Sequence, residues 1–125
     1  MASQDVRYYL NGLLVEYKEE EINAVATDGH RLALASSPLE NTKETEENRQ
    51  IIPRKAVLEL AKILKQEKSN ISLSFGNSSM HIKDKGLDFS TKLIDGKFPD
   101  YEKVLPTGGS NALEVSKENL QSALL

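Results

Sequence analysis

The groups best suited to recognition chemistry in this sequence gather at positions 27–32, which read Thr-Asp-Gly-His-Arg-Leu. An Asp-Gly pair between two apolar runs, Ile22–Val25 and Leu32–Leu34, predicts a hairpin turned at Asp28-Gly29, because glycine tolerates the positive φ of such turns. The imidazole of His30 and the guanidinium of Arg31 would then stand beside leucine and alanine side chains. Polar heads next to an apolar floor favour a small recognition pocket. The alternative is that both residues merely decorate a turn.

Two of these residues, Asp28 and His30, also have the types found in a catalytic triad. A carboxylate two residues away across a turn is poorly placed to orient an imidazole, and no serine sits in a nucleophile-elbow pattern. The sequence has two histidines without metal-site spacing, no cysteine and no P-loop. It therefore predicts recognition without catalysis, metal or cofactor. A small hydrolase that uses Asp28 and His30 is the disfavoured alternative.

The composition is that of an ordinary soluble domain. The 125 residues, 38% apolar and 28% charged, fit one domain or a piece of a larger one. No apolar run approaches the roughly 18–20 residues of a membrane span, and the first residues show no signal-peptide pattern. Cysteine is absent, so we expect a cytoplasmic protein without disulfides. Because the net charge is −3, contact with DNA would depend on a local basic face.

Apolar parity predicts the strands around the hairpin. Val6–Tyr17 has the pattern of a long strand whose parity slips at Asn11-Gly12, which indicates a β-bulge, a sharp bend or plain strand curvature. Further along we expect an acidic turn at residues 19–21, an end to the hairpin at Pro38, an exposed mobile loop over Glu40–Arg49 and a strand over Gln50–Ile52.

A helix is predicted over Pro53–Lys68, with the proline at the first helical position, where its missing N–H costs nothing. The spacing predicts a buried stripe made of Val57, Leu60, Ala61 and Leu64. The outward side carries more cations than its two glutamates balance: Arg54, Lys55, Lys62, Lys65 and Lys68. This side is either a solvated face or an attractor of nucleic acid, and the pattern alone leaves both interpretations open.

After the helix, three alternating runs within residues 71–93 predict an antiparallel meander whose polar face exposes His81. The connector Ile94–Pro106 follows, and its apolar side chains must dock elsewhere: Phe98, Tyr101, Val104 and Leu105.

The last residues predict a second unit. Thr107–Ser110 has the composition of a flexible hinge, and a strand over Ala112–Val115 and a helix capped by Ser116 should follow. Because that helix stops in mid-pattern, we expect residues 1–106 to form one domain and residues 107–125 to form a hinge and an incomplete second domain.

Five motifs occur along nearly the whole chain, in the order RYYLNG at 7–12, ATDGHRLA at 26–33, IPRK at 52–55, TKLIDGKFPDY at 91–101 and VLP at 104–106. Together they resemble the middle domain of the bacterial DNA polymerase III beta subunit, the sliding-clamp family. The resemblance implies an α+β DNA-clamp fold, with antiparallel sheets and helices on one face. It also implies a non-catalytic processivity factor: a head-to-tail dimeric ring around duplex DNA that tethers the polymerase III alpha subunit, the clamp loader and other replication and repair proteins.

The resemblance also assigns residues to two sites. A pocket for partner peptides would be lined by Leu10, Thr27, Gly29, His30, Arg31, Leu32, Pro99, Lys103 and Val104. Lys103 stands where the family carries arginine, so its contact should differ. DNA would contact Arg7, Tyr8, Tyr9, Arg54 and Lys55.

By length, the resemblance implies a fragment. It would lack the family's first domain, most of its last domain, and the helix expected before Gln4. A pocket that the family builds between two domains would then have one side only. Besides the hydrolase, a non-catalytic oligomerisation module is the remaining alternative.

Overall fold

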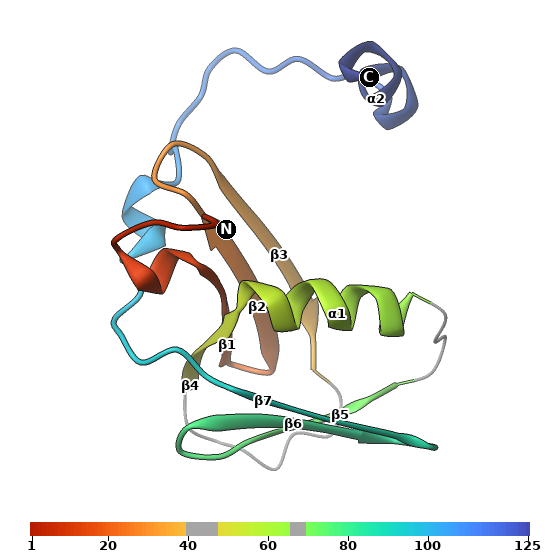
Figure 1. Ribbon diagram of the computed structural model, residues 1–125. Helices are drawn as coiled ribbons and strands as arrows, with labels where there is room; N and C mark the ends of the chain where they lie inside the picture. The colour runs from red at the N-terminus through yellow and green to blue at the C-terminus, as the bar shows by residue number, and fades with distance from the viewer. Residues whose placement is uncertain (40–47, 66–69) are drawn as a thin grey trace.

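The computed structural model describes residues 1–39, 48–65 and 70–125. Its strands form two antiparallel sheets, with the orders β3-β2-β1-β4 and β5-β6-β7 (Figure 1). The elements in chain order are the 3₁₀ turn η1 (Tyr8–Leu10), β1 (Gly12–Lys18), β2 (Glu21–Thr27), β3 (Leu32–Pro38), β4 (Asn48–Pro53), α1 (Arg54–Leu64), β5 (Ser72–Phe75), β6 (Ser79–Asp84), β7 (Leu87–Lys92), the 3₁₀ turn η2 (Tyr101–Val104) and α2 (Lys117–Leu124). The predicted α+β class with antiparallel sheets is confirmed.

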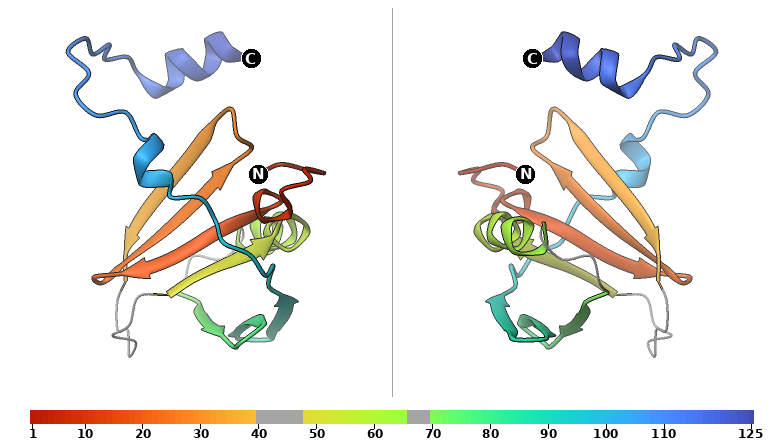
Figure 2. Two further views of the ribbon diagram at one scale, coloured as in Figure 1. Left: turned by 90° about the vertical axis from the view of Figure 1, so that its left-hand side faces the viewer. Right: turned by 90° about the vertical axis from the view of Figure 1, so that its right-hand side faces the viewer.

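Both faces of the larger sheet carry buried apolar side chains. Consecutive residues of its central strands are apolar, and neighbouring residues point to opposite sides. Leu14 and Ile51 lie on one face, in a buried cluster with Leu10, Val25, Phe98 and Tyr101. Val15 and Ile52 lie on the other, in a cluster with α1 and the second sheet through Ala56, Leu60, Met80 and Ile82. Figure 2 shows the connector after β7 running along one side of the larger sheet, with α2 apart from both sheets.

The prediction of a strand over Val6–Tyr17 is wrong for its first half. Residues 8–10 form η1, in which the N–H of Leu10 donates to the carbonyl of Arg7 at 2.9 Å. The Asn11 side chain and the Asp5 backbone exchange two hydrogen bonds, of 2.9 and 3.0 Å, which fold the chain back on itself. The parity slip thus marks the end of a turn, and β1 pairs without a bulge from Gly12 onward.

Gly12 explains why the strand can begin there. A Cβ on this residue would lie 2.6 Å from Cγ2 of Ile51 and 2.6 Å from the carbonyl oxygen of Ile52. Both distances are shorter than real Cβ contacts, so only glycine lets β1 approach β4 so closely.

The hairpin β2–β3 and the meander β5–β7 are confirmed. The turn is longer than the predicted Asp28-Gly29 pair, because Thr27 pairs with Leu32 and leaves a four-residue loop. The acidic turn is also present, with Glu19 and Glu20 at φ 52° and 66°.

The helix prediction needs small corrections. α1 begins at Arg54, so Pro53 is the cap and not the first helical residue. Ala61 is exposed, and Ala56 takes its place in the buried stripe. The predicted end at Lys68, within residues 66–69, lies outside the described residues.

The structure also bears on the remaining expected elements. Most of the predicted loop Glu40–Arg49 lies outside the described residues, but Arg49 belongs to β4. The strand expected over Ala112–Val115 is wrong, since these residues are irregular and exposed. The helix after them is confirmed, and the Ser116 hydroxyl accepts from the N–H of Asn119 at 3.2 Å. Across the part of the chain described here, no helix is long and apolar enough to cross a membrane.

Candidate functional site

The β2–β3 turn is held by its own polar side chains. Oδ1 of Asp28 accepts from the backbone N–H groups of His30 and Arg31 at 3.0 and 3.1 Å, and Oδ2 pairs with Nε of Arg31 at 2.9 Å. The Thr27 hydroxyl donates to the Arg31 carbonyl at 2.8 Å and accepts from the N–H of Gly29 at 3.2 Å. These bonds present exposed His30 and Arg31 side chains at the tip of a well-defined loop.

The Asp28 carboxylate is committed to this loop. The N–H donors of His30 and Arg31, followed by the Arg31 side chain, lower the pKa of Asp28 from 3.8 to about 2. Within the described chain, no hydrogen bond joins this carboxylate to the His30 ring. The geometry of the pair therefore gives no support to the hydrolase alternative.

The N-terminal segment packs against the same turn. Gly29 has φ +91°, and a Cβ on it would lie 3.0 Å from Nη2 of Arg7. Arg7 is fixed there by an ion pair with Asp5 at 3.0 Å, which also lowers the pKa of the Asp5 carboxyl. A residue predicted to contact DNA thus touches a residue predicted to line the peptide pocket.

The connector packs into the apolar cluster that lies next to the β2–β3 turn. Phe98 and Tyr101 are buried in the cluster that contains Leu10, and Leu32 and Leu105 pack against that cluster. Figures 1 and 2 show η2 alongside the β2–β3 hairpin, below its turn. Two segments about 70 positions apart in sequence therefore pack against one apolar cluster on the same face of the larger sheet.

The predicted pocket residues divide by depth. Leu10 is 1% exposed and lies below the surface, while Thr27 and Leu32 are half-buried. The exposed members are Gly29, His30, Arg31, Pro99, Lys103 and Val104. Val104 is 68% exposed, an unusual position for valine, and Lys103 makes an ion pair with Asp100 at 3.4 Å.

A polar cluster with a buried carboxylate and a partly exposed arginine ties the connector to the sheet, and no sequence motif predicts it. The Tyr101 hydroxyl donates to Oε2 of Glu16 at 2.5 Å, and Nε of Arg49 lies 3.1 Å from Oε1 of Glu16. The guanidinium carbon of Arg49 also lies 5.9 Å from the centre of the Tyr101 ring. Burial and the carboxylate together raise the pKa of the Tyr101 hydroxyl.

The residues predicted to contact DNA come from two adjacent segments. Tyr8 is exposed and makes an edge-on contact with Tyr9, at 5.8 Å between ring centres. The N–H of Arg54 donates to the carbonyl of Asn11 at 3.0 Å, which ties the start of α1 to the end of η1. Exposed Arg54 and Lys55 therefore stand close to the Arg7–Tyr9 segment.

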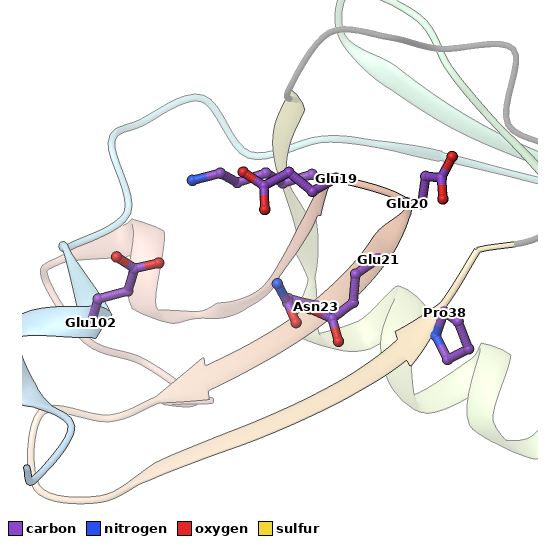
Figure 3. A pocket seen from close by; sticks show the side chains of 7 residues that line it. Glu19, Glu20, Glu21, Asn23, Pro38 and Glu102 are labelled. Carbon is purple, nitrogen blue, oxygen red and sulfur yellow. The ribbon is translucent and has the colours of Figure 1, made fainter.

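Other polar groups form two further clusters, one of which includes Glu102 of η2. A cavity of about 480 Å³ is bounded by four glutamates, two of them from the β1–β2 turn, and none of the predicted pocket residues lines it (Figure 3). On the second sheet, His81 is half-exposed, with Nδ1 2.9 Å from the Ser90 hydroxyl and Nε2 2.7 Å from Asp88. Among the described residues, no group of three His, Cys, Asp or Glu side chains is placed to hold a metal ion.

Comparison with known proteins relates this geometry to a family. A family model for the central domain of the DNA polymerase III beta subunit matches residues 1–100. The chain belongs to this family.

Relatives and solved structures agree with the match. The beta sliding clamps of Pseudomonas putida and Escherichia coli are 44% and 42% identical over 98% of this chain. A crystal structure of the DNA polymerase III subunit beta from Pseudomonas aeruginosa covers 88% of the chain at 45% identity and a TM-score of 0.81, and the Bacillus subtilis clamp covers 86% at 28% identity and a TM-score of 0.78.

The matches cover nearly all of this chain but only part of each relative. The chain spans about a third of the length of the curated relatives, 33% in each of these two cases, and 30% of the P. aeruginosa structure. It therefore corresponds to one part of a longer family architecture.

The Asp28 hydrogen bonds generate a prediction about pH. A carboxyl whose folded pKa is lowered stabilises the fold above its unfolded pKa, and that contribution is lost as the pH falls from 3.8 towards 2. In a pH titration followed by NMR, the His30 and Arg31 amide shifts should move with a midpoint near 2. Asp28→Asn should abolish this titration. A midpoint near 4 would contradict the assigned geometry.

Proposed function

We propose that this chain is a non-catalytic domain of a ring-shaped sliding clamp, a processivity factor that holds replication and repair proteins on duplex DNA. The observation that carries the proposal is that Leu32, beside the β2–β3 turn, packs against the apolar cluster that contains Tyr101 of η2, within a domain of the DNA polymerase III beta family. Catalysis is not needed for this role, because the attachment of a ring to DNA is topological. The protein would act in the cytoplasm, as a homodimeric ring in its full-length form.

Peptide recognition is supported by the polar and apolar groups that the β2–β3 turn and η2 expose. The turn offers an imidazole, a guanidinium and exposed backbone, and η2 adds an exposed valine and a lysine. A short peptide with two apolar anchors would gain about 1.5–3 kcal/mol for each anchor that it buries. After the cost of ordering, micromolar affinity is reasonable for a complete pocket. The polymerase III alpha subunit and the clamp loader are the proposed partners.

DNA attraction is supported by the start of α1. Arg54 and Lys55 add positive charge to the helix end whose dipole is already positive, where acidic residues would be more favourable for stability. Both side chains are exposed and stand at the end of the N-terminal segment, on a chain of net charge −3, so they supply local positive charge. Such charge attracts phosphates without regard to sequence, which suits a clamp that slides.

Replacing an exposed pocket residue tests the peptide site. His30→Glu places a negative charge in the pocket that would receive the apolar anchors of the peptide. It should weaken peptide binding by about tenfold or more. The probe is labelled griselimycin, which is bound to the P. aeruginosa sliding clamp in a solved structure, followed by fluorescence anisotropy. Asn77→Glu, which adds the same charge at the exposed β5–β6 turn, is the control. Equal affinities for both variants and wild type would contradict the pocket.

Removing the charges at the start of α1 tests the DNA surface. Each phosphate contact contributes about 0.9 to the slope of log affinity against log salt concentration. Arg54→Gln with Lys55→Gln should therefore weaken binding of a fluorescent duplex and flatten this slope by up to about two. Lys83→Gln with Lys92→Gln, which removes two exposed charges from the second sheet, should change it less. If the two double variants have the same slope, the α1 cations are only a solvated face.

A further inference from the structure

η2 has little local structure to hold it in place. It is four residues long, and Asp100 at its start makes no side-chain capping bond. Its last two residues, Lys103 and Val104, are exposed, whereas its first residue, Tyr101, is 4% exposed. Whatever fixes Tyr101 therefore fixes the part of the proposed pocket that η2 contributes.

Tyr101 is fixed by groups from two strands. Glu16 on β1 and Arg49 on β4 are directly opposite each other in the sheet, so their side chains share the face that carries Leu14 and Ile51. Tyr101 covers this pair, its hydroxyl bonded to one oxygen of Glu16 while Arg49 takes the other. The guanidinium of Arg49 also lies over the Tyr101 ring, with 5.9 Å between its carbon and the ring centre.

The contacts among Glu16, Arg49 and Tyr101 define the position of η2 more narrowly than apolar packing alone could. The Glu16 residue is 5% exposed, and a buried carboxylate is tolerated only when its oxygens have partners. A small shift of η2 would still leave Phe98 in an apolar surrounding, because hydrophobic contact has no direction. The same shift would separate the hydroxyl from Oε2 of Glu16, and hydrogen bonds weaken steeply with distance and angle.

We propose that Glu16, Arg49 and Tyr101 are positioning residues for the peptide pocket, which hold η2 at the place relative to the β2–β3 turn that binding requires. None of the three is among the residues expected to touch the peptide. The inference rests on the proposed function, since it concerns the same pocket. It adds an ionic cluster on the larger sheet, with Glu16 buried and Arg49 partly exposed, as the determinant of the pocket's shape.

Tyr101→Phe is the sharpest test because it keeps the ring and removes the one hydroxyl. Affinity for labelled griselimycin should fall by about three- to tenfold, the scale of one hydrogen bond. The amide NMR signals of Lys103 and Val104 should shift, while those of β5–β7 should not. Tyr17→Phe is the matched control, because Tyr17 is a half-buried β1 tyrosine whose ring packs near Phe75, away from η2. It should leave affinity and these signals unchanged.

A purely structural role makes a different prediction. The free energy of unfolding would then fall in Tyr101→Phe, with no change in affinity or in the η2 amide signals, and that result would overturn the inference. If Tyr101→Phe does not fold, Arg49→Lys, which keeps the charge on a partly exposed side chain, must produce the same η2 shifts. Equal griselimycin affinity of His30→Glu and the wild type would count against the proposed function, while the amide measurement would still decide the inference.

Discussion

The hydrogen bond between Tyr101 and Glu16 is the constraint on which the assembled site depends. It joins residues 85 positions apart, and it exists because strand alternation turns Glu16 towards the face on which the connector lies. A charged side chain in that place would be costly without Arg49 opposite it and the hydroxyl above it. Together with the apolar cluster around Leu14 and Phe98, this cluster makes a sheet, an N-terminal turn and a long connector into one unit.

The same unit brings the two proposed interaction surfaces together. Arg7 lies against Gly29 of the β2–β3 turn, and the Asn11 carbonyl accepts from the N–H of Arg54 at the start of α1. The N-terminal segment thus contacts the proposed peptide pocket on one side and leads to the proposed DNA surface on the other. A single short segment of chain links the groups assigned to both partners.

Local patterns in the sequence were sufficient for most of the elements. The hairpin, the meander and the helix after Pro53 follow from alternation, turn residues and a 3.6-residue period, and the structure confirms them. The pattern was insufficient at Val6–Leu10, because alternating apolar residues cannot reveal that Asp5 and Asn11 bond across a turn. The segment Ala112–Val115 also alternates, yet it makes no strand in the structure.

The sequence proposes members for the site but does not reveal the contacts that hold its segments in place. The motifs identified the turn and the connector, whereas Glu16 and Arg49 carry no motif and gain meaning only from their register, which pairs them across β1 and β4. Burial likewise distinguishes Leu10 from the exposed Val104 although both are apolar. Register and depth depend on the whole packed fold, which local spacing does not encode.

Peptide binding requires the β2–β3 turn and the connector to act as one binding site. NMR mapping of the wild-type chain during a griselimycin titration measures this most directly. Perturbed amide signals should appear together at residues 27–32 and 99–104, with the same dissociation constant for both groups. Perturbation confined to one of the two segments, or centred on β5–β7, would contradict the account.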